Sequence, residues 1–310
     1  MINTITLNPA IDHIFYLNRL ERNITNRLTD TAVSIGGKGT HVSVNLSILG
    51  TASRAFGFSF GQNGEQILKM LRQDSIEVHF IHGIGKESRD NYLLVEEDTR
   101  DCTLIVQQGP LPDQQQLADF FDLLIDKIRP GDDLVLSGDV SNFLGHDIYG
   151  EVLDMLADKR LRVFLDASGP SLQAVSKRAP FFIKPNLDEL TSLTGDKPTS
   201  DADIVRAILR LDPLNIRIIA VSLGGNGSIV RAGDTLYKVS PPKVNVYNTV
   251  GCGDCYVAGL VHSLQHHDNY EDALRVATAV SAAKAESPLS VGFDKARAEE
   301  LLSQVTIQRL

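Results

Sequence analysis

Residues 113–138, DQQQLADFFDLLIDKIRPGDDLVLSG, contain a helix pattern followed directly by a strand pattern. In 113–128 the apolar residues recur every three or four positions, at 117, 120, 121, 124, 125 and 128, which predicts a helix with one apolar face. After Pro130 and Gly131, the short apolar run in 133–138 predicts a buried strand. A helix followed at once by a buried strand is typical of α/β proteins.

The same alternation continues on both sides of this unit. We predict further strands at 3–7, 162–167, 181–185 and 217–224, and further helices at 147–159, 201–211 and 270–285. Strands that alternate with helices form a mostly parallel sheet with helices on both faces. Ligands of such sheets bind beyond the carboxyl ends of the strands, so we expect the functional site there.

Two segments interrupt the alternation. Residues 91–109 form two extended runs joined by a polar turn, which predicts an antiparallel hairpin. Residues 11–35 also contain strand-like runs with little helical period. We therefore expect one domain, 1–310, with a small antiparallel β-sheet lid built from about 11–35 and 86–109.

Composition excludes several classes of protein. The 310 residues carry a net charge of −9, which disfavours non-specific binding to nucleic acid or to an anionic membrane. Three cysteines do not make a disulfide framework. The N-terminus lacks a signal-peptide pattern, and no apolar run approaches the roughly 18 residues that span a bilayer. We expect a soluble, cytoplasmic protein.

The stretch NTVGCGDCYVAGL (248–260) carries the strongest chemical signal. Apolar residues at 257, 260, 261 and 264 predict a helix that starts near Gly253. The first N–H groups of a helix lack internal partners and carry partial positive charge, and Gly251 and Gly253 let a ligand approach the backbone closely. The stretch therefore predicts an anion site, with Asp254 at its edge placed to accept a proton from a hydroxyl group.

The same stretch permits two other interpretations. Cys252 and Cys255 form a Cys-x-x-Cys pair, which suggests redox or metal chemistry, and His262 lies seven residues further on. The carboxylate of Asp254 between the two cysteines disfavours a thiolate. Alternatively, the stretch is an ordinary glycine-rich helix start with two small buried thiols.

Two other glycine clusters have the same character. Gly37 and Lys38 lie in IGGKG (35–39), before a predicted helix, where the ammonium could hold a phosphate or stay solvated. The spacing differs from that of a Walker A loop. SLGGNGS (222–228) follows a predicted strand and could bring N–H groups to a polyphosphate or form a tight hairpin.

Single polar residues give weaker signals. In KPNLDEL (184–190), Asn186 and Glu189 have the spacing of a helix capping box, and their oxygens could also hold water around Mg²⁺. Asp12 ends NPAID (8–12) and could accept hydrogen bonds from sugar hydroxyls or cap a turn. Arg89 precedes the predicted hairpin and could bind a phosphate or stay solvated.

Taken in order, these motifs resemble those of the ribokinase-like (PfkB) carbohydrate kinases, and most closely those of the 1-phosphofructokinase and tagatose-6-phosphate kinase branch. The resemblance covers essentially the whole chain and rests on TLNPAID, GGKG, SRDN, LSGD, LDASG, KPNLDEL, SLGGNG and NTVGCGD. It implies an α/β core with a β-sheet lid that two subunits often share. It also implies ATP, Mg²⁺, a possible dependence on K⁺, and phosphoryl transfer to a sugar hydroxyl.

The resemblance assigns expected roles to individual residues. Asp254 would be the catalytic base, beside an anion hole formed by the backbone of Gly251, Cys252 and Gly253. The residues expected to bind the sugar phosphate are Asp12, Gly37, Lys38, Arg89 and Asp139. Those expected to bind ATP are Ser222, Gly224, Gly227, Asn186, Thr249, Gly253 and Ala282. Asn186 and Glu189 would hold the metal through water.

Three of these motifs depart from the family pattern. His41 stands where the family usually has Asn, SGDVS (137–141) replaces Ser-Gly-Ser-Leu-Pro, and Gly-Cys-Gly-Asp-Cys replaces Gly-Ala-Gly-Asp-Ser. His41 and Asp139 lie on the expected sugar side and leave the substrate open. We expect phosphorylation of fructose 1-phosphate to fructose 1,6-bisphosphate. Tagatose 6-phosphate, another sugar, or a non-catalytic role as a nucleotide-binding regulator are the alternatives.

Overall fold

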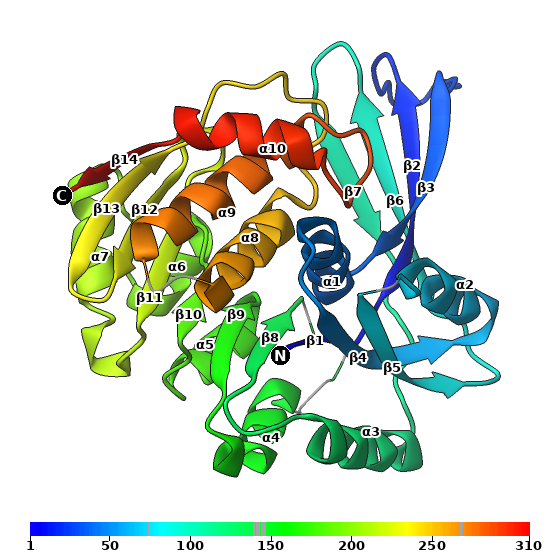
Figure 1. The fold of residues 1–310 in the computed structure, drawn as a ribbon. Coiled ribbons are helices and arrows are strands. Elements are labelled where there is room, and N and C mark those ends of the chain that lie inside the picture. Colours follow the sequence, from blue (N-terminus) through cyan, green and yellow to red (C-terminus); the bar gives the residue numbers. More distant parts are fainter. Residues whose placement is uncertain (74, 139, 141–142, 144–146, 267–268) are drawn as a thin grey trace.

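The computed structural model describes residues 1–310 except 74, 139, 141–142, 144–146 and 267–268 (Figure 1). A ten-stranded main sheet has the order β14-β13-β12-β11-β10-β9-β8-β1-β4-β5. Its strands are β1 (Ile2–Thr6), β4 (Ser53–Phe60), β5 (Ile76–Gly83), β8 (Asp133–Ser137), β9 (Arg162–Asp166), β10 (Phe182–Ile183), β11 (Ile218–Ser222), β12 (Ser228–Ala232), β13 (Thr235–Ser240) and β14 (Thr306–Arg309). All pairs from β5 to β11 are parallel, and the pairs from β11 to β14 are antiparallel.

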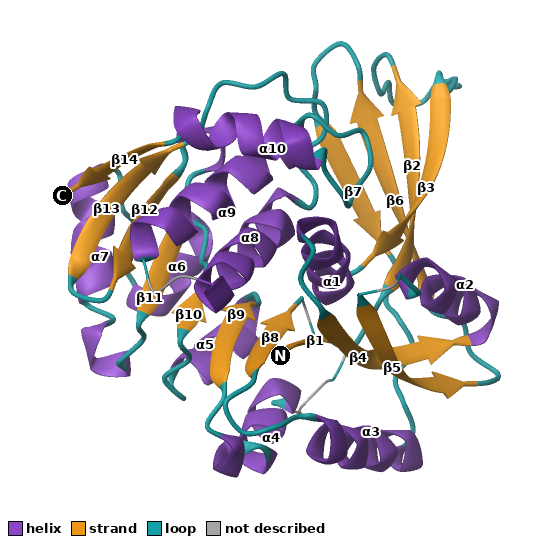
Figure 2. Ribbon diagram, viewed as in Figure 1, coloured by secondary structure: helices purple, strands orange, loops and turns teal. Residues whose placement is uncertain are grey.

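Helices cover both faces of the main sheet (Figure 2). One face carries α1 (Lys38–Leu49), α2 (Gly61–Leu71), α8 (Cys252–His266), α9 (Tyr270–Ala285) and α10 (Lys295–Leu301). The other carries α3 (Gln114–Lys127), α4 (Ile148–Met155), α5 (Gly169–Ser176), α6 (Leu187–Thr194) and α7 (Asp201–Leu209). Short 3₁₀ turns are η1 (Ala157–Lys159), η2 (Asp212–Leu214), η3 (Gly224–Asn226) and η4 (Leu302–Gln304).

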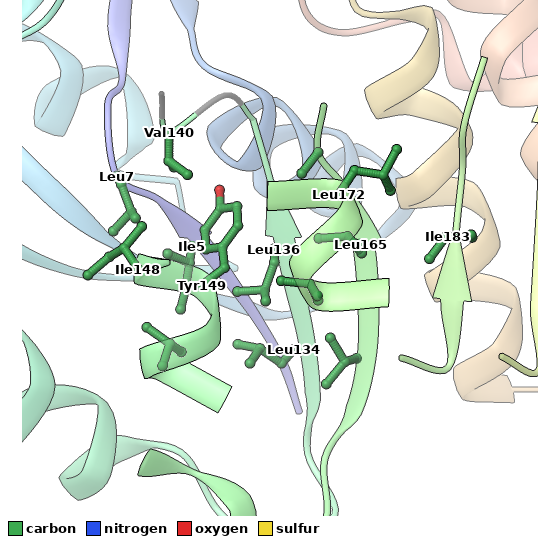
Figure 3. Packing of buried hydrophobic residues seen from close by; sticks show 14 of the residues in the cluster. Ile5, Leu7, Leu134, Leu136, Val140, Ile148, Tyr149, Leu165, Leu172 and Ile183 are labelled. Carbon is green, nitrogen blue, oxygen red and sulfur yellow. The ribbon is translucent and has the colours of Figure 1, made fainter. Parts of the chain in front are cut away.

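Strand periodicity explains why two cores form. In β8, Leu134 and Leu136 point into the core on the α3–α7 face, whereas Val135 points into the core beneath α8 and α9. Successive side chains of a strand point to opposite faces, so a strand that is apolar throughout is buried on both sides. Figure 3 shows the first core, where Tyr149 and Ile148 of α4 pack against β1 and β8.

A four-stranded small sheet lies apart from the main sheet, beside α1 and α2 (Figure 1). It contains β2 (Ala10–Leu17), β3 (Asp30–Gly36), β6 (Arg89–Glu96) and β7 (Cys102–Val106), in the order β3-β2-β6-β7. The pairs β2–β3 and β6–β7 are antiparallel, as predicted, but the central pair β2–β6 is parallel. The chain enters the small sheet twice, once after β1 and once after β5, and both times it leaves the carboxyl end of a parallel strand of the main sheet. The first strands of these two segments, β2 and β6, therefore run in the same direction.

The predicted fold class is confirmed, and the strands and helices predicted from 3–7 to 270–285 all form, with ends shifted by a few residues. The helix predicted over 147–159 ends at Met155 and continues as η1. The sequence analysis missed β4, α2, β5, α5 and α10, and also the antiparallel edge β13–β14. No helix among the described residues is long and apolar enough to cross a membrane.

Candidate active site

Asp254 lies in the first turn of α8, and its side chain is buried. The preceding Gly251 has φ +85°, and a Cβ at this position would lie 2.0 Å from the carbonyl oxygen of Ser290. Only glycine combines this left-handed backbone with so close an approach of a second segment. Gly251 therefore allows the chain to turn into α8 against the loop that contains Ser290.

The backbone donors beside Asp254 are partly available. Among the described residues, neither the N–H of Gly251 nor that of Gly253 donates a hydrogen bond. The N–H of Cys252 donates to the carbonyl of Thr249 at 3.2 Å. Of the three N–H groups expected to form an anion hole, two thus remain without a protein acceptor at a helix N-terminus, where anions bind favourably.

His41 on α1 contacts Asp254. Its Nδ1 lies 2.6 Å from Oδ2 of Asp254, and its Nε2 lies 2.9 Å from the carbonyl oxygen of Ile35. Burial opposes a charge on the ring, but the hydrogen bond and charge of Asp254, aided by Asp12, raise the pKa of His41. The sequence analysis noted His41 as a departure but did not predict this contact.

Asp12 of β2 lies close to the same histidine. Its Oδ1 accepts a hydrogen bond from Asn91 of β6 at 2.9 Å, and its Oδ2 lies 3.7 Å from His41 Nε2. Gly37, with φ +107°, precedes the first residue of α1. The buried imidazole of His41 therefore lies between the carboxylates of Asp12 and Asp254, two residues that are far apart in the chain.

A second group of charges lies at the carboxyl ends of β9 and β10. Nζ of Lys38 and Nζ of Lys184 lie 3.3 and 3.2 Å from Oδ1 of Asp166. Burial opposes ionisation of Asp166, but Lys184 and Lys38 outweigh it and lower the pKa of this carboxyl. The carboxylates of Asp166 and Asp254 likewise raise the pKa of the half-buried Lys38, although burial opposes its charge. Lys184 and Asp166 stand in the quoted motifs KPNLDEL and LDASG, but the sequence analysis assigned them no role.

Arg89 begins β6 and pairs with Ala10 across the small sheet. Its guanidinium donates to the carbonyl of Asn8 at 3.1 Å and to that of Gln107 at 3.4 Å. It thus lies where the chain enters the small sheet, beside the motif that contains Asp12. Asp139, the remaining residue expected on the sugar side, lies outside the described residues.

The residues expected to bind ATP occupy the same edge of the sheet. Ser222 ends β11, Gly224 begins η3 and Gly227 follows it. Thr249 is exposed beside the start of α8, and Ala282 lies on α9. Ser222, Gly224 and Gly227 thus lie around the carboxyl end of β11, whereas Thr249 and Ala282 lie beside and on two helices, α8 and α9, that pack against one another.

Asn186 and Glu189 form the predicted capping box of α6. Asn186 Oδ1 accepts from the Glu189 N–H, and Glu189 Oε2 accepts from the Asn186 N–H, both at 2.9 Å. The cap occupies one carboxylate oxygen and leaves Oε1 for other ligands. The described residues contain no cluster of three His, Cys, Asp or Glu side chains suited to a metal. These donors therefore fit an ion bound through water and phosphate, not one enclosed by protein.

The cysteines lack the features of a redox or zinc site. Burial raises the pKa of Cys252 to about 11 and that of Cys255 well above its usual value. His262, the nearest candidate ligand, has its Nδ1 2.5 Å from the hydroxyl of Thr51. A buried Cys255 and a partly buried Cys252 with protonated thiols act as small apolar side chains.

Lys284 of α9 is fully buried beneath the same turn. Its Nζ donates to the carbonyl of Asn248 at 3.3 Å, and no carboxylate among the described residues forms an ion pair with it. Burial is the main cause that lowers the pKa of Lys284. The sequence analysis named Ala282, two residues before it, but assigned Lys284 no role.

Fold and site together define an α/β protein with a buried carboxylate at a glycine-rich helix N-terminus, at the carboxyl edge of its sheet. Residues 5–293 match the model of the family described as "pfkB family carbohydrate kinase". The chain therefore belongs to this family of ATP-dependent sugar kinases.

Solved structures agree with this assignment. A candidate phosphofructokinase from Staphylococcus aureus is 31% identical over 100% of this chain and 99% of its own, with a TM-score of 0.82. A candidate 1-phosphofructokinase from Thermotoga maritima is 24% identical over 100% and 99%, with a TM-score of 0.87. Phosphofructokinase-2 from Escherichia coli, solved with substrates and products, is 22% identical over 98% of both chains, with a TM-score of 0.91. The last two show the shared fold.

Proposed function

We propose that this kinase transfers the γ-phosphoryl group of ATP to a hydroxyl of a ketohexose phosphate, with fructose 1-phosphate as the preferred acceptor. One observation carries the proposal: the buried carboxylate of Asp254 lies beside two backbone N–H groups that have no acceptor among the residues that the structure describes. A base next to an anion site is what attack by a hydroxyl on a phosphate requires. The 31% identity to the candidate phosphofructokinase from Staphylococcus aureus supports a phosphorylated fructose as the acceptor.

Asp254 Oδ2 is bonded to His41, so Oδ1 faces the acceptor hydroxyl. The proton of that hydroxyl passes to Oδ1, the oxygen attacks the γ-phosphorus, and the bond to the β-phosphate oxygen breaks as ADP leaves. The N–H groups of Gly251 and Gly253 stabilise the charge on the phosphoryl group during transfer.

Lys38 and Arg89 are proposed to hold the phosphate already on the sugar. Lys38 pairs with Asp166 here, but Lys184 pairs with the same carboxylate oxygen. Lys38 can therefore turn toward a phosphate while the charge of Asp166 stays compensated. An unphosphorylated sugar would give the Lys38 ammonium no anionic partner of its own.

Mg²⁺, when bound, would neutralise charge on the ATP phosphates. Asn186 and the open Oε1 of Glu189 would accept hydrogen bonds from its water ligands.

The small sheet is proposed to act as the lid of one domain, 1–310. Its inner face contacts the turn before α8, since Tyr16 packs edge-on against Tyr247 at 6.0 Å and donates to the carbonyl of Pro288 at 2.9 Å. A movement of the small sheet would therefore displace the turn that precedes the proposed anion site. Closure would exclude water and limit hydrolysis of ATP.

A second copy of the chain is proposed to cover the outer face of the small sheet. A row of side chains crosses all four strands on this face: Val33, His13, Tyr92 and Ile105. Val33 and Ile105 are 48% and 52% exposed, and the His13 and Tyr92 rings stack at 5.6 Å. We also infer a cytoplasmic location, since all three cysteines are free thiols, as in reducing compartments.

The mechanism is tested with Asp254→Asn. We expect turnover to fall by at least roughly 10²–10⁴-fold, since the base is lost, while ATP affinity stays within about twofold. Turnover is measured by coupled ADP release and affinity by calorimetry. Cys255→Ala, on the same helical turn but facing the core, is the matched control and should keep its turnover. Unchanged turnover in Asp254→Asn would refute the mechanism.

The substrate is tested with a panel of fructose 1-phosphate, fructose 6-phosphate, tagatose 6-phosphate and fructose. We expect the highest kcat/KM with fructose 1-phosphate. A higher value with another sugar would replace this assignment, and nucleotide binding without any turnover would favour the regulator.

A further inference from the structure

The environment of His41 restricts its protonation. The ring is 4% exposed, and each of its nitrogens faces an oxygen: Nδ1 faces Oδ2 of Asp254 at 2.6 Å, and Nε2 faces the carbonyl of Ile35 at 2.9 Å. A backbone carbonyl only accepts hydrogen bonds, so Nε2 carries a proton. Nδ1 then has two options. It carries a second proton and donates to an ionised Asp254, or it accepts the proton of a neutral Asp254.

The surrounding charges favour the first option. Two carboxylates face the ring, Asp254 from α8 and Asp12 from β2, the latter with Oδ2 3.7 Å from Nε2. Asn91 of β6 donates to Asp12, and β3 contributes the Ile35 carbonyl. Lys38, on the same helix as His41, is paired with Asp166. An imidazolium between two carboxylates compensates buried negative charge that would otherwise be costly.

We propose that His41 is a positioning residue of the kinase reaction, which acts as an imidazolium that binds Oδ2 of Asp254 and thereby aims Oδ1 at the acceptor hydroxyl. The same ring connects the carboxylate proposed to bind the sugar with the carboxylate proposed to act as base. The inference rests on the proposed function and deepens it, because it adds a protonation state on which turnover depends.

The sign of the pH dependence follows from the geometry. While the ring is doubly protonated, the Nδ1–H holds Oδ2. When pH rises past the pKa of His41, Nδ1 loses its proton and presents a lone pair to Oδ2, so the carboxylate turns away. The structure therefore predicts that kcat falls on the alkaline side and that this fall disappears when the ring is removed.

The first experiment needs no turnover. Nitrogen-15 NMR of the imidazole rings, recorded on the ligand-free protein and assigned with His41→Asn, reports protonation at each ring nitrogen. We expect both nitrogens of His41 to be protonated at pH 7, and we expect Asp254→Asn to lower the pKa of the ring. A ring that carries one proton throughout pH 6–8 would overturn the proposal. This result stands even if no phosphosugar is turned over, an outcome that would sink only the proposed function.

The second experiment measures kcat against pH for the wild type, His41→Asn and His41→Gln. In both variants we expect kcat at pH 7 to drop roughly tenfold to a hundredfold and the alkaline fall to vanish, with KM for ATP within about twofold. His79→Asn removes an imidazole of β5 that stacks on Phe56 outside the site, and this variant should keep the wild-type profile. A variant at position 41 that retains the wild-type kcat or the wild-type alkaline fall would refute the proposal. Melting curves identify a variant that fails to fold, and the NMR measurement then decides alone.

Discussion

Three buried or half-buried basic groups near Asp254 differ in how far neighbouring carboxylates compensate their charge. His41 lies between carboxylates, and Lys38 shares Asp166 with Lys184. Lys284 is fully buried, and among the described residues its ammonium donates to a carbonyl oxygen and pairs with no carboxylate. A buried ammonium without a carboxylate loses its hydration with little in return, so Lys284 should reduce the stability of the folded chain.

We therefore expect Lys284→Met to increase the free energy of unfolding by about 1–3 kcal/mol at pH 7. The folded-state pKa of Lys284 lies below its unfolded value, so the penalty is complete below the folded pKa. It is relieved as pH rises through that value, because the folded state then releases the proton first. Urea unfolding at pH 7 and pH 9.5 should show the difference between variant and wild type shrinking. A variant less stable than wild type at pH 7 would show that the ammonium is a net stabiliser.

At the scale of the element, the start of α8 depends on one backbone conformation. The turn at Gly251 packs against the carbonyl of Ser290, and this contact positions the first N–H groups of the helix. Gly50, at the end of α1, has the same φ of +85°, but a Cβ there would meet nothing within 4 Å. A substitution at Gly50 therefore measures the cost of backbone strain alone, whereas a substitution at Gly251 adds a steric conflict with the carbonyl of Ser290.

We expect Gly50→Ala to lower stability by about 1–2 kcal/mol, the cost of a left-handed alanine. Gly251→Ala should cost more, because the loop containing Ser290 must also move, and it should lower kcat as the anion site widens. Thermal unfolding and ADP-release assays of both variants measure this. Equal losses of stability with unchanged kcat would contradict the role given to Gly251.

At the scale of the whole molecule, a proposed role is assigned to each face of the small sheet. Its inner face meets the turn before α8 through Tyr16, and its outer face carries the exposed row that ends in Ile105. Contiguous apolar surface on a soluble protein marks an interaction site. One sheet would thus serve both the site and the dimer.

We expect the wild type to sediment as a dimer and Ile105→Glu to shift it toward the monomer, because a buried unpaired carboxylate opposes association. Leu209→Glu, an exposed leucine on α7 at 44%, is the matched control and should leave the dimer intact. Analytical ultracentrifugation over a range of protein concentrations measures both. A dimer that survives Ile105→Glu at every concentration would place the interface elsewhere.

Local sequence predicted most of the elements. The periodicity of apolar residues encodes whether an element is buried on one face or on two. This signal is present in the apolar spacing of 113–128 and 270–285 and in the short apolar runs of β8 and β9. It failed for β4, α2, β5, α5 and α10, which the sequence analysis left unassigned. It also failed for the parallel pair β2–β6, since pairing between distant strands depends on the directions in which both leave the main sheet.

For the site, the sequence by itself determined the glycine turn, the helix that follows it and the position of Asp254, because these depend on backbone freedom and helix polarity within a few residues. Only the tertiary structure decided which charges meet. The contact of His41 with Asp254 spans 213 residues, and that of Lys38 with Asp166 spans 128. The protonation of such groups depends on burial and on neighbours brought together by the fold, and neither is a property of a local stretch of chain.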